Sequence, residues 1–122
     1  MKKILPKTFV KTKTVSGFIV DIRWEIKNIT RQIVERYKPE KIWLFGSAAQ
    51  GNFSLDTDLD FLIIKKDTPE SGLERIRQLR YLIDKKVAAD FLVCRPEEID
   101  ERIRLGDPFI KSIFQEGKQL YG

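Results

Sequence analysis

Lys41-Ile42-Trp43-Leu44-Phe45-Gly46-Ser47, followed by Asp58-Leu59-Asp60-Phe61-Leu62-Ile63-Ile64, is the stretch that decides the fold of this chain. Each half contains a short apolar run with the length and composition of a buried strand. Gly46 follows the first run, and glycine permits the sharp backbone turn that must come there. Residues 47–50 then read as one helical turn that ends at Gly51. The stretch therefore predicts a strand, a turn and a second strand.

The turn at Gly46 and Ser47 is a candidate phosphate-binding site. The N–H groups that open a helical turn are available to an anion, and the helix dipole favours negative charge there. Ser47 would add a hydroxyl donor. A Gly-Ser pair alone also reads as a strand-to-helix turn capped by serine, because capping serines are common. The acidic residues that follow the turn favour the first interpretation.

Asp58 and Asp60 begin the second apolar run. Residues two apart in a strand project from one face, about 6.6 Å apart along the backbone. Two such carboxylates can reach a pair of Mg²⁺ ions about 3.5–4 Å apart, and Mg²⁺ prefers oxygen ligands. Asp56-Thr57-Asp58 is another Asp-x-Asp in the same chain. The position after the Gly-Ser turn, more than the spacing, therefore predicts the metal site.

A third acid, Asp90, interrupts the apolar run of residues 87–94. An ionised carboxylate inside an apolar strand has to be neutralised, paired or bound to a metal, because uncompensated burial is costly. A metal site shared with the earlier acids would supply the compensation. A salt bridge to a Lys or Arg, or an exposed strand end, would do so equally well.

These motifs resemble those of the nucleotidyltransferases of the DNA polymerase β superfamily, in which a Gly-Ser pair precedes an Asp-x-Asp and a later strand carries a third Asp. The resemblance covers residues 40–122. It implies an α/β fold like the palm of DNA polymerase β, with a small mixed β-sheet flanked by helices. It also implies a role for each residue: Gly46 and Ser47 bind the nucleotide, and Asp58, Asp60 and Asp90 are catalytic and bind two Mg²⁺ ions.

Within that superfamily the ending Gly106-Asp107-Pro108-Phe109-Ile110, then Glu116-Gly117, looks like that of the minimal nucleotidyltransferases. Such proteins are often antitoxins paired with HEPN-domain ribonuclease toxins, and some adenylylate a tyrosine of the toxin. The resemblance therefore implies ATP as substrate and a HEPN protein as partner. Many relatives carry an arginine in the turn, where this chain has Ala48, Ala49 and Gln50. A catalytically weak or inactive antitoxin that acts by binding is the alternative.

Composition predicts one small domain. The 122 residues, 42% of them hydrophobic, can build a single core. We assign residues 21–122 to that domain and residues 1–20 to a basic N-terminal extension of unknown role. No apolar run is long enough for a membrane span or a signal peptide, so we expect a cytoplasmic protein. The single cysteine and the absence of histidine exclude a common zinc site and His-dependent catalysis.

A net charge of +5 raises a further alternative, a basic nucleic-acid-binding module. The excess charge is spread along the sequence, and Trp24, Trp43 and Phe45 fall in apolar runs that we assign to the core. We therefore expect no specific nucleic-acid partner and no membrane partner. The sequence leaves a homo-oligomer open.

Helical spacing and capping residues predict the flanking helices. The first helix carries an apolar stripe of Ile22, Ile26, Ile29, Ile33 and Tyr37. The second begins near Thr68-Pro69-Glu70, with Thr68 as its N-cap, and buries Leu73, Ile76, Leu79 and Ile83. A third helix opens at Pro96, and a fourth opens at Asp107-Pro108 and ends at Gly117. Alternating strands and helices indicate an α/β fold.

Overall fold

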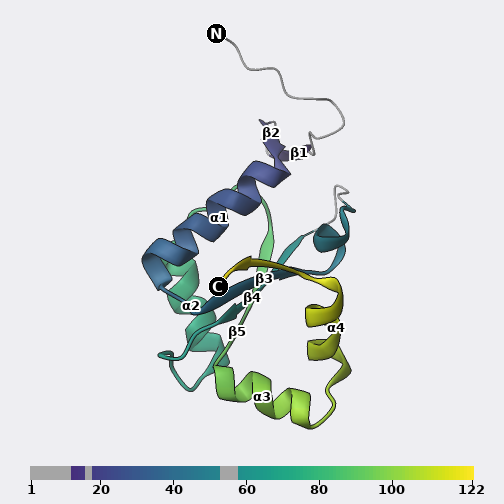
Figure 1. Ribbon diagram of the computed structural model, residues 1–122. Coiled ribbons are helices and arrows are strands. Elements are labelled where there is room, and N and C mark those ends of the chain that lie inside the picture. The colour runs from purple at the N-terminus through teal and green to yellow at the C-terminus, as the bar shows by residue number, and fades with distance from the viewer. Residues whose placement is uncertain (1–11, 16–17, 53–57) are drawn as a thin grey trace.

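The computed structural model describes residues 12–15, 18–52 and 58–122 of the chain, and its elements are arranged as Figure 1 shows. The strands are β1 (Thr12–Val15), β2 (Phe18–Asp21), β3 (Lys41–Phe45), β4 (Leu59–Ile64), β5 (Ala89–Cys94) and β6 (Lys118–Tyr121). The helices are α1 (Ile22–Tyr37), η2 (Ser47–Gln50), α2 (Gly72–Leu82), α3 (Pro96–Arg104) and α4 (Pro108–Glu116). Within these described residues, every helix is too short or too polar to cross a membrane.

The main sheet has four strands in the order β5-β4-β3-β6. β3 runs antiparallel to β4 and to β6, whereas β4 and β5 are parallel. The parallel pair needs a crossover, and α2 lies in it. The expected small mixed sheet flanked by helices is therefore confirmed.

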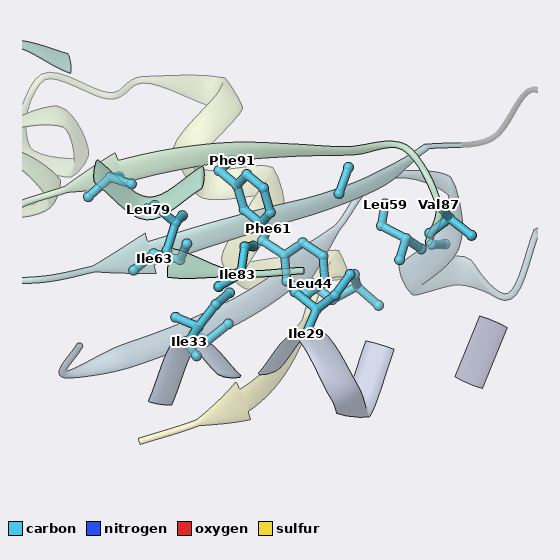
Figure 2. Packing of buried hydrophobic residues seen from close by; sticks show 14 of the residues in the cluster. Ile29, Ile33, Leu44, Leu59, Phe61, Ile63, Leu79, Ile83, Val87 and Phe91 are labelled. Atoms are coloured by element: carbon cyan, nitrogen blue, oxygen red, sulfur yellow. The ribbon is translucent and has the colours of Figure 1, made fainter. Parts of the chain in front are cut away.

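One face of the sheet packs against α1 and α2. Figure 2 shows Phe61 of β4 among neighbours from β3, β5 and both helices, including Leu44, Phe91 and Ile29. The Phe61 and Phe91 rings stack with their centroids 5.6 Å apart. Phe61, Ile29 and Ile33 are completely buried. This face holds the larger part of the core.

The opposite face packs against α3 and α4. Alternation along β4 turns Leu62 and Ile64 to this side, where they meet Ile110 and Ile113 of α4. Trp43 and Phe114 pack edge to face, with ring centroids 4.9 Å apart. The sheet is thus the middle layer of three, and both of its faces are buried over most of their length.

Three of the predicted helices are confirmed. Every member of the α1 stripe is buried or half-buried. Pro96 and Pro108 are the first residues of α3 and α4, in the position where the missing N–H of proline costs nothing. The Asp107 carboxylate accepts hydrogen bonds from the N–H groups that open α4, and Gly117 follows its last residue.

The prediction for the second helix is wrong at its start. α2 begins at Gly72 and its N-cap is Ser71, whose hydroxyl accepts the N–H of Glu74 at 3.3 Å. Leu73 is 68% exposed, and Arg75 is buried instead. The Arg75 guanidinium donates hydrogen bonds to the carbonyls of Pro69 and Glu70. The buried arginine therefore binds the carbonyls that an earlier helix start would have used.

Two further features were not predicted. β6 adds a strand beside β3, and β1 pairs with β2 in an antiparallel hairpin within the region assigned to the basic extension. The hairpin leads directly into α1, where the Asp21 carboxylate accepts the N–H groups of Arg23 and Trp24 at 3.0 and 3.2 Å. Asp21 therefore caps α1.

Candidate active site

The predicted turn is confirmed at the end of β3. Gly46 has φ 75° and ψ −159°, a conformation essentially restricted to glycine. Residues Ser47–Gln50 form the single 3₁₀ turn η2, and Gly51 ends it with its N–H on the carbonyls of Ala48 and Ser47. A Cβ on Gly46 would lie closer than 3.0 Å to Oδ2 of Asp60. The turn and the acid are therefore in direct contact.

Asp60 lies on β4, which pairs with β3 on one side and with β5 on the other. In the sheet register it is opposite Phe45 of β3 on one side and opposite Asp90 of β5 on the other. Because paired residues of neighbouring strands share a face, both carboxylates project from the side that also carries Leu62. Asp60 is half-buried and Asp90 is exposed. The structure thus brings these two acids together at one end of the sheet.

Asp58 stands just outside the strand. We expected the strand to begin at Asp58. β4 instead begins at Leu59, so Asp58 lies one residue before it. Its side chain is exposed. It is nevertheless close enough to Asp60 to influence that group electrostatically. Ser47, Asp58, Asp60 and Asp90 therefore surround the same end of the sheet.

The electrostatics of the site are those of a cluster of like charges. Burial raises the pKa of Asp60, and repulsion from Asp90 and then from Asp58 raises it further. No salt bridge found among residues 18–52 and 58–122 includes any of these three acids. A cation placed among the carboxylates would lower the pKa of Asp60 and so favour its ionised form.

The donor set suits a hard cation, because every candidate ligand is a carboxylate oxygen. In the part of the chain that the structure describes, no three Asp, Glu, Cys or His side chains converge closely enough to hold an ion as they stand. Asp58 and Asp90 are both exposed, and both lie near enough for their charges to raise the pKa of Asp60. The residues therefore fit Mg²⁺ by their chemistry, and the two-ion site remains a prediction.

The environment of Asp90 differs from the sequence-based expectation. We expected a carboxylate inside an apolar strand, which would need a metal or an ion pair. β5 is an edge strand, and Asp90 is only its second residue, at the end of the face that α3 and α4 leave uncovered. Water therefore solvates this carboxylate. Of the interpretations considered, the exposed strand end describes Asp90 best.

Gln50 is one of the three residues, with Ala48 and Ala49, that fill the turn in which many of the resembled proteins carry an arginine. Its Nε2 donates a hydrogen bond to the carbonyl of Glu116 at 2.8 Å. This bond ties the turn to the end of α4. The turn Ser47–Gln50 itself contains no basic residue.

Phe109 is a site neighbour that the sequence did not reveal as one. Its ring packs edge to face on Phe45, with centroids 5.6 Å apart, and 45% of the residue is exposed. Phe45 is the ladder partner of Asp60. The aromatic edge of α4 thus borders the acids. Only the packing of α4 on the sheet shows this, and no local pattern around Phe109 indicates it.

The chain matches a known family over most of its length. The family model described as nucleotidyltransferase domain matches residues 26–121, a range that includes the turn and the strands carrying the acids. A crystal structure of a proposed nucleotidyltransferase from Sulfolobus solfataricus is similar over 66% of this chain and 78% of that chain, with 23% identity and a TM-score of 0.48. No curated protein matches the chain.

Proposed function

This chain belongs to the nucleotidyltransferase domain family, and from that premise we propose that it transfers AMP from ATP to a hydroxyl group in a Mg²⁺-dependent reaction. The observation that carries the proposal is the contact of Gly46 with Asp60, together with the register that sets Asp60 beside Asp90. The turn at Gly46 and the two carboxylates would then face one bound nucleotide.

The triphosphate would lie at the turn. The first N–H groups of a 3₁₀ turn have no partners within the turn, and they can donate to phosphate oxygens. Ser47 is exposed and adds its hydroxyl. The half-exposed Phe109 ring would offer a surface to the base. We assign the β- and γ-phosphates to Ser47 and the turn, because this places the α-phosphate toward Asp60.

Asp58, Asp60 and Asp90 are the residues that would hold the metal ions. Divalent cations bound there would stabilise charge on the α-phosphate and lower the pKa of the acceptor hydroxyl. With such ions bound, the three carboxylates would orient the phosphates. The half-buried Asp60 lies between its two neighbours and would be shared.

In the transfer step the acceptor oxygen attacks the α-phosphorus. The new O–P bond forms as the bond from the α-phosphorus to the bridging oxygen breaks, and pyrophosphate leaves with that oxygen. Asp90 would receive the hydroxyl proton as general base. Its exposure on an edge strand supports this role, because an acceptor can approach it from solvent.

We further propose that the acceptor is a tyrosine of a HEPN-domain toxin and that the chain is its antitoxin. The support is the resemblance of the site motif and of the C-terminal region to minimal nucleotidyltransferases. A protein acceptor also agrees with an open, exposed Asp90.

The test is transfer of label from α-³²P-ATP to a candidate HEPN protein in the presence of Mg²⁺. We expect labelling by the unaltered chain and none by Asp58→Ala. Asp100→Ala is the matched control, because Asp100 is an exposed acid of α3 remote from the site. Equal labelling by Asp58→Ala and the control would contradict the assignment. Mass spectrometry of the labelled product identifies the modified residue.

A second candidate is an antitoxin that acts by binding alone. It is favoured by Gln50, whose amide is bound to Glu116 and supplies no positive charge to a leaving pyrophosphate. Charged hydrogen bonds contribute about 1.5–3 kcal/mol, so their loss would slow transfer. Toxin neutralisation that survives simultaneous replacement of Asp58, Asp60 and Asp90 would favour this function over catalysis.

A further inference from the structure

A second cleft lies away from the acids, between α1 and the segment that leads into β5. Its volume is about 380 Å³. Trp24, Arg31 and Arg36 line it from α1, and Lys85 and Lys86 line it from the segment. α1 covers the face of the sheet opposite to the one that carries Asp60. This cleft is therefore separate from the proposed transfer site.

The cleft carries more positive than negative charge. Arg31, Arg36, Lys85 and Lys86 all contribute to its wall. The exposed Asp84 is the carboxylate that also lines it. Two further acids of α1 lie near: Glu35 pairs with Arg31 at 3.0 Å, and Glu25 is completely buried beneath the cleft. Positive charge remains in excess after these acids are counted.

Buried polar side chains hold the cationic segment in place. Gln32, only 3% exposed, donates to the carbonyl of Asp84 and accepts its N–H, both at 2.7 Å. The buried Glu25 carboxylate accepts the backbone N–H of Lys86. Arg36 donates to Gln32 at 2.9 Å and to the carbonyl of Leu82 at 3.0 Å. The two lysines are therefore carried by a backbone that is already ordered before any ligand binds.

Trp24 supplies an aromatic surface at one end of this row. We expected it in the core, yet 56% of the residue is exposed. The helical stripe explains this, because Trp24 lies two residues after Ile22 and so points away from the buried side of α1. From Trp24 to Arg36 the helix extends about 18 Å. An exposed aromatic ring with cations along such a length matches a chain of bases and phosphates.

We propose that this cleft binds single-stranded nucleic acid, with a base stacked on Trp24 and phosphates bound by Arg31, Lys85 and Lys86. The cations are spread along the sequence, but folding gathers them from α1 and the segment before β5. The sequence-based argument against a nucleic-acid site does not hold at this place. Binding would not depend on base identity, because stacking and phosphate contacts are sequence-tolerant.

The first test uses a fluorescently labelled 12-nucleotide RNA of mixed sequence, with EDTA and without ATP, followed by fluorescence anisotropy. Lys85→Glu/Lys86→Glu should weaken binding at least about tenfold and lower the slope of log K against log salt by roughly 1.4. Lys111→Glu/Lys118→Glu is the control, because it changes net charge equally at exposed positions elsewhere. Equal losses in both double variants would overturn the proposal, since they would indicate diffuse attraction.

The second test separates stacking from charge. Trp24→Ala should weaken RNA binding on the order of tenfold while leaving binding of inorganic polyphosphate unchanged. An unchanged RNA affinity, or a duplex bound as tightly as the single strand, would overturn the proposal. If the double lysine variant fails to fold, Arg31→Ala probes the same cleft. Because no ATP or Mg²⁺ is present, these outcomes are independent of the transfer reaction.

Discussion

At Gly46 the chain needs both a backbone that only glycine adopts readily and the space that a side chain would fill. The φ of 75° lies outside the usual range for other residues. The Asp60 carboxylate occupies the position toward which a Cβ would point. Gly51 also has a positive φ, of 81°, but nothing lies within 4 Å of its Cβ position. Substitutions at both glycines would strain the backbone, but only one at Gly46 would also crowd Asp60.

We predict that Gly46→Ala destabilises the fold by about 1–3 kcal/mol through backbone strain and abolishes label transfer. Gly51→Ala should cost about 1–2 kcal/mol and leave transfer largely intact. Urea unfolding and the α-³²P assay measure the two effects. Transfer that persists in Gly46→Ala at the level of Gly51→Ala would show that the contact with Asp60 is not needed.

Among the elements, α2, β5 and α3 are joined by the side chain of Arg75. Arg75 is 3% exposed, and its guanidinium donates a hydrogen bond to the carbonyl of Val93 at 3.0 Å. It also donates to both carboxylate oxygens of Glu98, at 2.7 and 2.9 Å. Glu98 in turn accepts the N–H of Arg95 at 2.8 Å. This arrangement positions α3 against the end of β5.

Arg75→Met should destabilise the fold by about 3 kcal/mol, because it leaves the Val93 carbonyl and Glu98 without their main partner. Arg77→Met is the matched control on the same helix. Arg77 makes an exposed pair with Glu74, and such pairs contribute only about 0–1 kcal/mol. Chemical unfolding of both variants measures the difference, and similar losses would mean that Arg75 contributes no more than a surface residue.

The same pair gives the fold a dependence on acid. Hydrogen bonding from Arg75 lowers the pKa of Glu98 from 4.5 to about 2, although partial burial opposes the shift. A carboxyl group whose pKa is lower in the folded state stabilises that state above its unfolded pKa and loses this contribution as the pH falls. The stabilisation should therefore disappear between about pH 4.5 and pH 2.

We predict that Glu98→Gln is less stable than the unaltered chain at pH 7 and that this difference shrinks as the pH falls through that window. Urea midpoints at pH 7, 4 and 3 test it. Glu101→Gln is the control, because Glu101 forms only an exposed pair with Arg104. A difference that stays constant with pH would contradict the assignment to ionisation of Glu98.

The molecule as a whole is organised around a sheet with apolar packing on both faces. Ile33 of α1 and Ile110 of α4 are each completely buried, but on opposite sides of that sheet. Neither face alone carries all of the large buried side chains. We therefore expect the two sides to unfold together as one cooperative unit.

Ile33→Val and Ile110→Val should each cost about 0.5–1.5 kcal/mol. Their effects should add in the double variant, because the sheet separates the two sites. The measurement is urea unfolding followed by both fluorescence and circular dichroism. Two separate transitions, or a probe-dependent midpoint, would show that the faces unfold independently.

Sequence reasoning succeeded where local chemistry decides the outcome. Isoleucines at helical spacing placed α1, and Asp107 with Pro108 placed the start of α4. Gly46 and Asp60 flank one short connection, so their proximity could be inferred from the strands around it. These features depend on neighbours in the chain or on one turn.

It failed where a distant residue decides. The start of α2 depends on the burial of Arg75, which binds the Pro69 and Glu70 carbonyls and is held by Glu98 of α3. The exposure of Asp90 depends on β5 being an edge strand. β6 is short and mostly exposed, with little hydrophobic signal. The error at Trp24 has a different cause. Its exposure could have been predicted locally, because the apolar stripe of α1 places Trp24 off the buried side.

The pairing of Asp60 with Asp90 also has a consequence for how the protein comes into being. The two acids meet only through the ladder between β4 and β5, and a slip of one residue would turn Asp90 to the other face. On the ribosome β4 emerges well before β5, with α2 between them. A growing chain that has reached only α2 therefore carries the turn and the first acids but no paired carboxylates. The transfer reaction that we propose would therefore begin only after β5 has emerged and docked.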